Sequence, residues 1–411
     1  MVLEAIKFDR SDPEKISVSI LDQLLLPYLT RYVPIFGIDD GYRVIKNMQV
    51  RGAPAIAMAG TLSVLLETQP LLSEEYMASQ WFYDPLDWAS TKKRLSQRLE
   101  FLLSSRPTAV NLANSLTVIS SLLETADNIR VFRDNLYIYA CELLAKDLEN
   151  NVRMGENGAK YLLNLLKTEG FHGEFAVLTI CNTGSLATAG YGTALGVIRS
   201  LWKDSQNKTL LGDKGHEQVE TVKMGHVFAL ETRPYNQGSR LTAYELLQDE
   251  IPSTLITDSS IAYKIQTSSI PIKAAFVGAD RIVRNGDTAN KIGTLQLAVI
   301  CRQFGVKFFV VAPKNTVDNK TLTGDDIVVE ERDADEFKSV TGTLICPEKG
   351  SPILDSDNKP ITAKIGLAPP QINVWNPSFD VTPYKFIDGI VTEEGVFTKD
   401  QNGKFNLDTL F

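Results

Sequence analysis

Two residues that could do chemistry follow two apolar segments of the chain. Cys181 follows the run FAVLTI, which begins at Phe175, and Asp280 follows the run AAFVGA, which begins at Ala274. Continuous apolar runs of this kind are typical of strands in a sheet that is covered on both faces. Ligands of such sheets bind beyond the carboxyl ends of the strands, so a thiol and a carboxylate placed there could act as an acid/base pair.

Either residue taken alone has an ordinary structural interpretation. A thiol near a helix N-terminus can have a lowered pKa, but a free cysteine is also a common small hydrophobic residue of a protein core. Asp280 is followed by turn residues and could simply cap a solvated loop. The position of both residues in one predicted sheet favours a catalytic interpretation, and we expect an apolar pocket to hold Asp280 partly protonated near neutral pH.

The segment that begins at Cys181 reads CNTGSLATAGYGTA and leads into a predicted helix. Thr183 and Ser185 offer hydroxyl groups, Gly184 allows close approach of the backbone, and a helix N-terminus attracts anions. We therefore predict a phosphate cradle at these three residues, although many turns of α/β proteins look similar without binding a ligand. The segment lacks the GK[ST] of a P-loop and the GxGxxG of a dinucleotide fold.

A third polar segment, ETRPYNQGSRLTA from Glu231 to Ala243, also follows a predicted strand. Gln237 could reach the hydroxyl groups of a sugar. Arg233 and Arg240 could pair with a phosphate or could brace the loop.

The elements that position these residues are predicted from the periodicity of the chain. The further apolar runs HVFALE, KFFVVA and FIDGIVT alternate with helical stretches such as LTAYELLQDE and GTLQLAVICRQFG. This alternation predicts an α/β domain with a doubly wound, mostly parallel sheet over residues 153–411. The preceding residues 1–152 read as short β-strands, AIKFD and ISVSI, followed by a helical bundle.

Composition excludes several classes of protein. The chain has 411 residues, 44% of them hydrophobic, and a formal net charge of −8, which argues against broad nucleic-acid binding but not against one phosphorylated ligand. The N-terminus lacks the apolar core of a signal peptide, and no apolar run is as long as a membrane span. We expect no membrane association and a cytosolic protein, and no sequence rule forbids a nuclear pool.

The cysteines and histidines do not indicate a metal site. Four cysteines lie far apart without a CxxC pair, and the three histidines form no HxxxH pair. A disulfide framework is also unexpected in a chain of this size. Two segments, the aromatic stretch Glu74 to Ser90 and the polar stretch Lys203 to Lys223, are predicted to be surface insertions.

Six separated motifs together resemble one known family. They are RGAPAIA, SRPTAVNL, CNTGSLATAGYGTA, ETRPYNQGSRLTA, GADRIVRNGDTANKIGT and NPSFDVTP. In this order and over nearly the whole chain, they resemble the methylthioribose-1-phosphate isomerases of methionine salvage. The resemblance implies a Rossmann-like C-terminal domain, a helical N-terminal domain, an active site between them, a homodimer, and no metal or organic cofactor.

The resemblance also implies a role for individual residues. It implies a small phosphorylated sugar as substrate, Asp280 as catalytic acid and Cys181 as its catalytic partner. The implied substrate ligands are Arg51, Gly52, Ala53, Arg106, Gln237, Asn290 and Lys291.

The implied reaction converts 5-methylthioribose 1-phosphate into 5-methylthioribulose 1-phosphate. Because C1 carries phosphate, the ring cannot open to a free aldehyde, so an acid such as Asp280 must protonate the ring oxygen as the ring C–O bond breaks. Hydrogen then passes from C2 to C1. Cys181 could remove the C2 proton as a thiolate, or it could stabilise the charge that develops during a direct hydride transfer.

Two other functions remain compatible with the motifs. Ribose-1,5-bisphosphate isomerases resemble this chain around the catalytic pair. The regulatory subunits of the guanine-nucleotide exchange factor of translation initiation share the fold, but they generally lack the paired cysteine and aspartate. The nearly complete set of motifs favours the methylthio substrate.

Overall fold

The structure is a computed structural model that describes residues 3–73, 82–83, 87–107, 109–212 and 222–410. The chain divides into two compact units. The N-terminal unit comprises Met1–Leu26, Thr30–Glu149 and Ser185–Gly190, and the C-terminal unit comprises Pro27–Leu29, Asn150–Gly184 and Tyr191–Phe411. Helix α6 (Ile129–Thr168) contributes residues to both units, and the predicted domain boundary between residues 152 and 153 lies inside this helix.

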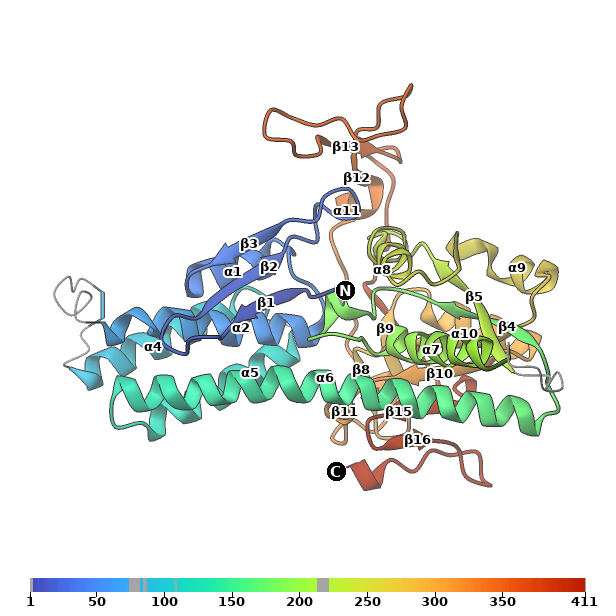
Figure 1. Ribbon diagram of the computed structural model, residues 1–411, viewed down its shortest axis with the longest axis horizontal. Helices are drawn as coiled ribbons and strands as arrows, with labels where there is room; N and C mark the ends of the chain where they lie inside the picture. Colours follow the sequence, from blue (N-terminus) through green and yellow to red (C-terminus); the bar gives the residue numbers. More distant parts are fainter. Residues whose placement is uncertain (1–2, 74–81, 84–86, 108, 213–221, 411) are drawn as a thin grey trace. The chain divides into compact units, whose positions relative to one another are not determined.

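The N-terminal unit combines a small antiparallel sheet with a group of helices (Figure 1). The sheet has the order β1-β2-β3, formed by Ile6–Asp9, Ser17–Leu21 and Tyr32–Ile35. The predicted strands AIKFD and ISVSI are therefore present. The helices that precede α6 are α1 (Ile38–Lys46), α2 (Ala53–Thr68), α4 (Trp88–Leu103) and α5 (Val110–Thr125), with the 3-10 turn η1 (Pro70–Leu72) after α2.

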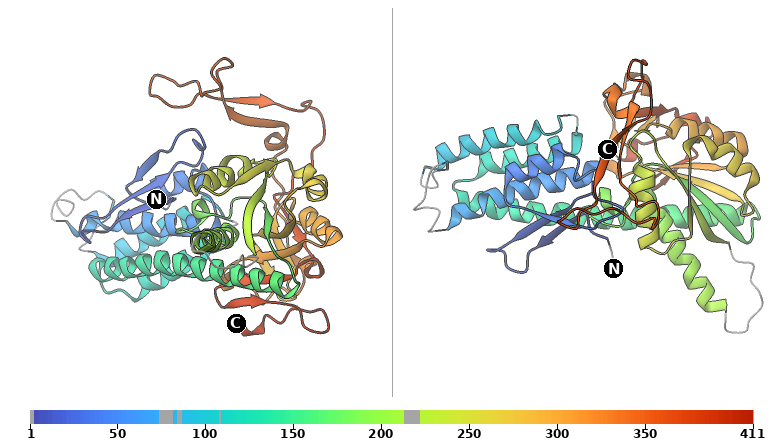
Figure 2. Two further views of the ribbon diagram at one scale, coloured as in Figure 1. Left: turned by 45° about the vertical axis from the view of Figure 1, so that its right-hand side comes forward. Right: turned by 90° about the horizontal axis from the view of Figure 1, so that it is seen from above.

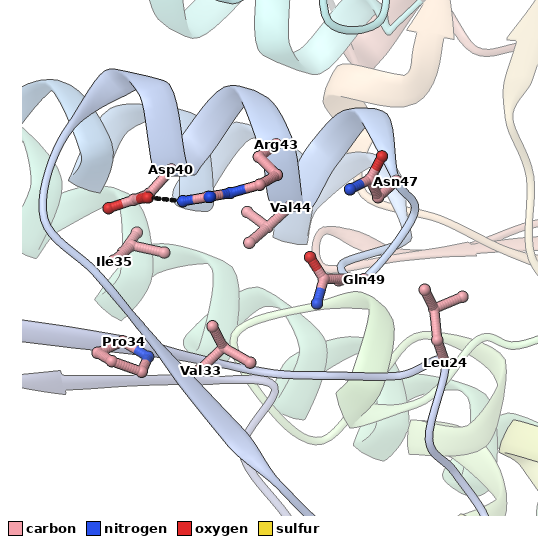
Figure 3. A pocket seen from close by; sticks show the side chains of 9 residues that line it. All are labelled: Leu24, Val33, Pro34, Ile35, Asp40, Arg43, Val44, Asn47 and Gln49. Atoms are coloured by element: carbon pink, nitrogen blue, oxygen red, sulfur yellow. Dashed lines mark hydrogen bonds and ion pairs between the residues drawn. The ribbon is translucent and has the colours of Figure 1, made fainter. Parts of the chain in front are cut away.

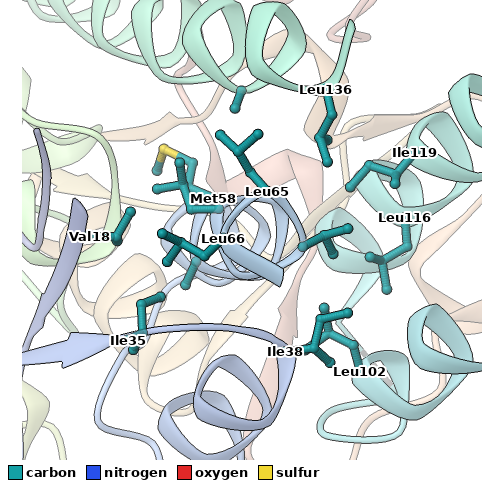
Figure 4. Close-up of a cluster of buried hydrophobic side chains, with 14 of the residues drawn as sticks. Val18, Ile35, Ile38, Met58, Leu65, Leu66, Leu102, Leu116, Ile119 and Leu136 are labelled. Atoms are coloured by element: carbon teal, nitrogen blue, oxygen red, sulfur yellow. The ribbon is translucent and has the colours of Figure 1, made fainter. Parts of the chain in front are cut away.

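Helix α2 is the buried centre of this unit. Pro54 lies in its first turn, where the missing N–H costs no helical hydrogen bond. Figure 4 shows Met58, Leu65 and Leu66 of this helix among side chains from the sheet and from neighbouring helices. The stretch Ala53–Leu72 is long and apolar enough to cross a membrane, which corrects our expectation, but 78% of its most apolar window is buried inside the protein.

The C-terminal unit is built on a seven-stranded sheet of order β16-β15-β10-β7-β4-β5-β6. All of its pairings are parallel except that of β16 with β15. The strands are Glu174–Thr179 (β4), Lys223–Leu230 (β5), Ser253–Ile256 (β6), Ile272–Val277 (β7), Lys307–Val311 (β10), Gly389–Thr392 (β15) and Gly395–Phe397 (β16). The predicted doubly wound, mostly parallel sheet is confirmed.

Alternate residues of each central strand pack into two separate cores. Phe175 and Val177 of β4 pack with the end of α6 and with α7 (Ala194–Gly212), and Ala176 and Leu178 pack with α10 (Thr294–Phe304) on the other face. Successive side chains of a strand point to opposite faces, so burial of both faces explains the continuous apolar runs in the sequence. The remaining helices of the sheet region are α8 (Ala243–Gln248) and α9 (Ile261–Thr267).

Two smaller sheets complete the C-terminal unit. One has the order β11-β8-β9-β14, from Val317–Asp318, Arg281–Val283, Thr288–Lys291 and Phe379–Thr382. The other pairs β12 (Ser339–Thr343) with β13 (Thr362–Gly366) in an arm that follows the short helix α11 (Ala334–Lys338). Figure 2 shows this arm extending away from the rest of the unit, and the sequence did not predict it.

The structure bears differently on the two segments that were predicted to be surface insertions. Residues 74–81 and 84–86 of the aromatic stretch lie outside the described residues, and its last residues, from Trp88, begin α4. Lys203 to Gly212 continue helix α7 and are not an irregular insertion, which corrects that prediction. Residues 213–221 lie outside the described residues, and Lys223 begins β5.

Candidate active site

Three neighbouring parallel strands carry three of the predicted site residues. Strand β4 pairs with β7 on one side and with β5 on the other. Cys181 follows β4, Asp280 follows β7, and Gln237 lies in the segment after β5. Because parallel strands end at the same edge of a sheet, these residues belong to one edge, the edge at which ligands of such sheets bind.

Cys181 is buried and held at both of its backbone groups. Its N–H donates to the hydroxyl oxygen of Thr232 at 2.9 Å, and its carbonyl accepts a hydrogen bond from the hydroxyl of Thr242. Its thiol donates to Oε1 of Gln237, with 3.5 Å between Sγ and the oxygen. The structure therefore brings Cys181 and Gln237 together, as the motifs predict.

Cys181 and Thr232 both have backbone conformations that side chains rarely adopt. Their φ angles are 71° and 62°, in the left-handed region that a β-branched residue such as Thr232 strongly disfavours. The carboxylate of Asp258 holds this turn, because it accepts from the N–H of Thr232 at 2.8 Å and from the N–H of Arg233 at 2.7 Å. Strained backbone of this kind is concentrated at functional sites.

The loop of Gln237 is also attached to the base of the arm. Tyr235 donates its hydroxyl to Glu336 in α11, and Arg233 donates from Nη2 to the carbonyl of Phe337 at 3.1 Å. Burial, together with the hydrogen bond to Glu336, raises the pKa of Tyr235 to about 12, so this hydroxyl remains a donor at neutral pH. Of the two roles that the sequence allows for Arg233, the structure supports bracing of the loop.

The segments of Cys181 and Asp280 are in direct contact. A Cβ placed on Gly278, two residues before Asp280, would lie 2.9 Å from Cγ2 of Thr183. The carbonyl of Thr183 in turn accepts from the N–H of Thr193 at 2.8 Å, which closes the turn that leads into α7. The side chain of Thr183 thus packs where the two strand ends meet.

Gly184 of the predicted phosphate cradle packs against a buried ion pair. The carboxylate of Glu245 fills the space beside Gly184, where even a single added carbon would collide with it. Glu245 is fully buried, and its charge is balanced by Arg199, whose Nη2 lies 2.7 Å from Glu245 and 2.6 Å from Asp249. The absence of a side chain at Gly184 leaves room for this ion pair, and the phosphate cradle at Thr183, Gly184 and Ser185 stays a prediction. Ser185 belongs to the N-terminal unit, in the 3-10 turn η2 (Ser185–Ala187).

Asp280 is exposed to solvent, and its N–H donates to the carbonyl of Ala289 at 2.9 Å. This hydrogen bond starts the β8–β9 hairpin that leads to Asn290 and Lys291. Because the residue is exposed, the expected enclosure of its carboxyl group in an apolar pocket is not observed.

Asn290 and Lys291 are the last residues of β9. The side-chain amide of Asn290, 6% exposed, donates from Nδ2 to the hydroxyl of Thr294 at 3.0 Å. The ammonium of Lys291 lies 4.3 Å from the ring centre of Phe379 and 5.5 Å from that of Tyr235. Tyr235 is two residues from Gln237, so the structure places Lys291 beside the glutamine loop.

Asp380 supports this corner, and its role was not predicted from the sequence. It lies opposite Asn290 in the β9–β14 ladder, and its carboxylate accepts from the N–H groups of Gly293 at 2.8 Å and Leu295 at 3.0 Å. Burial raises the pKa of Asp380 to about 6, although these N–H groups and Lys291 oppose the shift. The carboxylate occupies the N-terminus of α10, and its sequence signal was its place inside the motif NPSFDVTP.

The remaining predicted ligands lie in the N-terminal unit. Gly52, with a φ of 89°, precedes the first residue of α2, Ala53, and a Cβ added to it would lie 2.5 Å from the Cβ and the carbonyl oxygen of Ala187. The guanidinium of Arg51 donates from Nε to the carbonyl of Met48 at 3.4 Å. Arg106 is half-buried in the turn between α4 and α5, and its carbonyl accepts from the N–H of Ala109. Thr108, two residues further in this motif, lies outside the described residues.

A hollow in the N-terminal unit lies between β3 and α1 (Figure 3). Its lining residues are Leu24, Val33, Pro34, Ile35, Asp40, Arg43, Val44, Asn47 and Gln49. None of the predicted site residues lines it, so it has no part in the predicted chemistry. Over the residues that the structure describes, no group of three His, Cys, Asp or Glu side chains is placed to hold a metal ion.

Comparison with known proteins gives matches along the whole chain. A family profile described as "Initiation factor 2 subunit family" matches residues 49–399. Methylthioribose-1-phosphate isomerase of Saccharomyces cerevisiae strain YJM789 is 67% identical over 411 residues, with both chains fully covered. The enzyme of the same name from Vanderwaltozyma polyspora is 65% identical over 415 residues and is also fully covered.

Two solved structures resemble this chain in fold, and their sequence identities to it are nearly equal. The 5-methylthioribose 1-phosphate isomerase of Pyrococcus horikoshii OT3 has a TM-score of 0.75 at 32% identity, covering 99% of this chain and 95% of that one. Translation initiation factor eIF-2B subunit delta of A. fulgidus has a TM-score of 0.72 at 31% identity, covering 99% of both chains. The resemblance to methylthioribose-1-phosphate isomerases predicted from the six motifs is confirmed. The chain belongs to the initiation factor 2 subunit family.

Proposed function

We propose that this chain catalyses the aldose–ketose isomerisation of 5-methylthioribose 1-phosphate to 5-methylthioribulose 1-phosphate, a step of methionine salvage. The observation that carries the proposal is the position of Cys181 and Asp280 after two adjacent parallel strands, in a chain that is 67% identical over its full length to isomerases of this name. A non-catalytic regulatory subunit has no use for such a pair.

We assign the two catalytic residues complementary roles. Asp280 protonates the ring oxygen as the ring C–O bond breaks, which gives an open-chain intermediate that still carries its C1 phosphate. Asp280 is exposed, and bound substrate would favour its protonated form by displacing water from the carboxyl group. Cys181 then acts at C2, as the base or as the group that stabilises developing charge.

The other predicted residues bind the substrate in this proposal. The guanidinium groups of Arg51 and Arg106 neutralise the phosphate, since charge-assisted hydrogen bonds from arginine suit phosphate oxygens. The backbone of Gly52 and Ala53 assists them at the beginning of α2. Gln237, Asn290 and Lys291 bind polar groups of the sugar, and the contact of Gln237 with the thiol supports a role for that amide near the reacting carbon.

Assays of the purified chain with two substrates test the proposal. We expect rapid conversion of 5-methylthioribose 1-phosphate and little or no conversion of ribose 1,5-bisphosphate. Faster turnover of the bisphosphate would support the rival isomerase. Absence of turnover with both substrates, together with stoichiometric co-purification of initiation-factor subunits, would support a regulatory subunit.

The route of hydrogen transfer is tested with substrate that carries deuterium at C2. Appearance of solvent hydrogen at C1 of the product would rule out a purely intramolecular hydride transfer. Complete retention of deuterium is compatible with a hydride and also with a shielded thiolate that returns the same proton.

We also propose that the chain acts as a homodimer in the cytoplasm. The dimer rests on the family resemblance, and sedimentation equilibrium at several protein concentrations tests it, because a mass equal to that of one chain throughout the range would contradict it. Imaging of the tagged chain in its own cells tests the compartment and reveals any nuclear pool.

A further inference from the structure

The two residues that follow Cys181 hold buried polar atoms without hydrogen-bond partners. Asn182 is 8% exposed and Thr183 is 7% exposed. Among the residues that the structure describes, Oδ1 and Nδ2 of Asn182 and Oγ1 of Thr183 have no hydrogen-bond partner. Buried polar groups of folded proteins are nearly always bonded, so three such atoms in consecutive residues beside a predicted catalytic thiol require an explanation.

The surroundings of these atoms are otherwise well bonded. The backbone N–H and carbonyl of Cys181 bond to Thr232 and Thr242, and the buried carboxylate of Glu245 pairs with Arg199. Among the described residues of this strand end, the hydroxyl of Thr179 is the other buried polar atom without a partner, and Asn182 is the residue whose donor and acceptor both lack one. An amide left unpaired in this way lowers the stability of the chain, and a ligand that bonded it would recover that loss.

The hydrogen-bonding groups of the amide indicate which part of a ligand it could bind. A side-chain amide donates from Nδ2 and accepts at Oδ1, and a hydroxyl group of a sugar can do both in return. Phosphate oxygens at neutral pH mainly accept, and a methylthio group does neither well. In the proposed reaction the oxygen at C2 is a hydroxyl in the aldose and a carbonyl in the ketose, so Oδ1 would accept from the first and Nδ2 would donate to the second.

We propose that Asn182 is a substrate-binding residue whose side-chain amide bonds the oxygen at C2 of the sugar phosphate. The inference rests on the proposed isomerase function. Peptide linkage to Cys181 makes Asn182 the immediate neighbour in the chain of the residue that acts at C2. The packing of Thr183 against Gly278 places the same segment at the strand end that carries Asp280.

The amide is free to take this role because nothing in the described chain holds its orientation. Both of its polar atoms are shielded from solvent, so the contact requires the side chain to rotate as the substrate arrives. The rotation breaks no hydrogen bond, since the amide makes none among the described residues. A structural amide, or one bonded to a buried water molecule, would behave differently when it is removed.

Two substitutions of Asn182 test the assignment. Asn182→Leu removes both polar atoms and retains most of the shape, and Asn182→Ala provides a second variant if leucine is too large to pack. We expect the melting temperature of Asn182→Leu to stay the same or to rise, because an unpaired polar group is replaced by an apolar group of similar shape. We expect kcat/KM for 5-methylthioribose 1-phosphate to fall by about 10-fold or more, the scale of a lost hydrogen bond to a substrate hydroxyl.

Two controls separate substrate binding from other effects. Thr61→Val removes a fully buried and unpartnered hydroxyl from α2, and it should leave kcat/KM unchanged. Inhibition by inorganic phosphate should be the same in wild type and in both Asn182 variants, because the amide is assigned to the sugar and not to the phosphate. A weakened phosphate inhibition in the variants would contradict the assignment to the C2 oxygen.

The outcomes distinguish this inference from the proposed function. Wild-type activity with unchanged kcat/KM in a folded Asn182 variant would overturn the inference and leave the isomerase function intact. A fall in melting temperature of both Asn182 variants by more than about 5 °C, with kcat/KM retained, would show that the amide is structural. Absence of wild-type turnover would overturn the proposed function itself.

Discussion

The hydroxyl of Thr232 holds the backbone of Cys181, and its removal gives a prediction with a magnitude. Thr232 is fully buried, accepts from the N–H of Cys181 at 2.9 Å and donates to the carbonyl of Leu230 at 3.1 Å. Thr232→Val preserves the shape of the side chain and removes only the oxygen. The N–H of Cys181 would then be buried without this acceptor, which costs about 1–3 kcal/mol.

This loss should be visible in both stability and catalysis. For a unit of this size, about 1–3 kcal/mol corresponds to a fall in melting temperature of about 2–12 °C, measured by circular dichroism. A catalytic group displaced by about 1 Å can lose about 100-fold in rate. We therefore expect kcat for 5-methylthioribose 1-phosphate to fall by about 10- to 100-fold, with a smaller change in KM.

Thr232→Ser is the matched control, because it retains the hydroxyl and relieves the β-branched side chain at a φ of 62°. We expect its kcat to remain close to that of the wild type. Equal melting temperatures and equal kcat values for the valine and serine variants would refute the reasoning, since the hydroxyl would then contribute nothing to the position of Cys181.

Further predictions concern the catalytic pair, the N-terminal unit and Asp380. Cys181→Ser and Asp280→Asn should each fold normally and lower kcat by about 100-fold or more, and near-normal turnover of either folded variant would remove its role. Arg106→Ala should mainly raise KM in steady-state assays, because it loses a phosphate contact; an unchanged KM would count against that contact. Gly52→Ala should lower the urea midpoint by at least the equivalent of about 1 kcal/mol, because a Cβ at a φ of 89° would collide with Ala187, so a wild-type midpoint would contradict the observed packing. The raised pKa of Asp380, about 6 against a usual 3.8, means that the native state binds this proton more tightly than the unfolded state. The stability of the wild type relative to Asp380→Asn should therefore fall as pH rises from about 4 to about 6 and level off above, and a pH-independent difference in urea midpoints would contradict the shift.

The central sheet was predictable because burial on both faces leaves a direct signal. The run from Phe175 reads as continuous apolar residues, and in the structure alternate members pack into two different cores. The same signal located β5, β7, β10 and β15. The position of Cys181 and Asp280 at one edge follows from that sheet, because both residues directly follow apolar strands.

Hydrogen bonds between distant segments could not be predicted, because they have no periodicity. Asp258 holds the turn of Thr232 across 26 residues, and Asp380 holds the start of α10 across more than 80. Each carboxylate looks like an ordinary polar residue in the sequence. Only the resemblance to a family marked the segments of Thr232 and Asp380, and it assigned neither residue a role.

The arm formed by β12 and β13 was missed for a different reason. Its strands are short and none of their residues is fully buried, so they lack the apolar alternation that a packed strand shows. Helix α7 was predicted to end too early because the polar residues from Lys203 resemble a loop, yet Ser205 still packs inward as a buried residue.

The carboxylates of Glu245 and Asp380 have a consequence for the ions that surround the protein. Glu245 fills the space beside Gly184, and Asp380 occupies the first turn of α10. A carboxylate of the chain itself therefore stands at each of these two positions, where a free anion could otherwise bind. Sulfate or phosphate from a buffer gains nothing at either place. Such ions should therefore compete with the substrate at the arginine side chains that we assign to its phosphate, and inhibition by simple anions should follow a single competitive site.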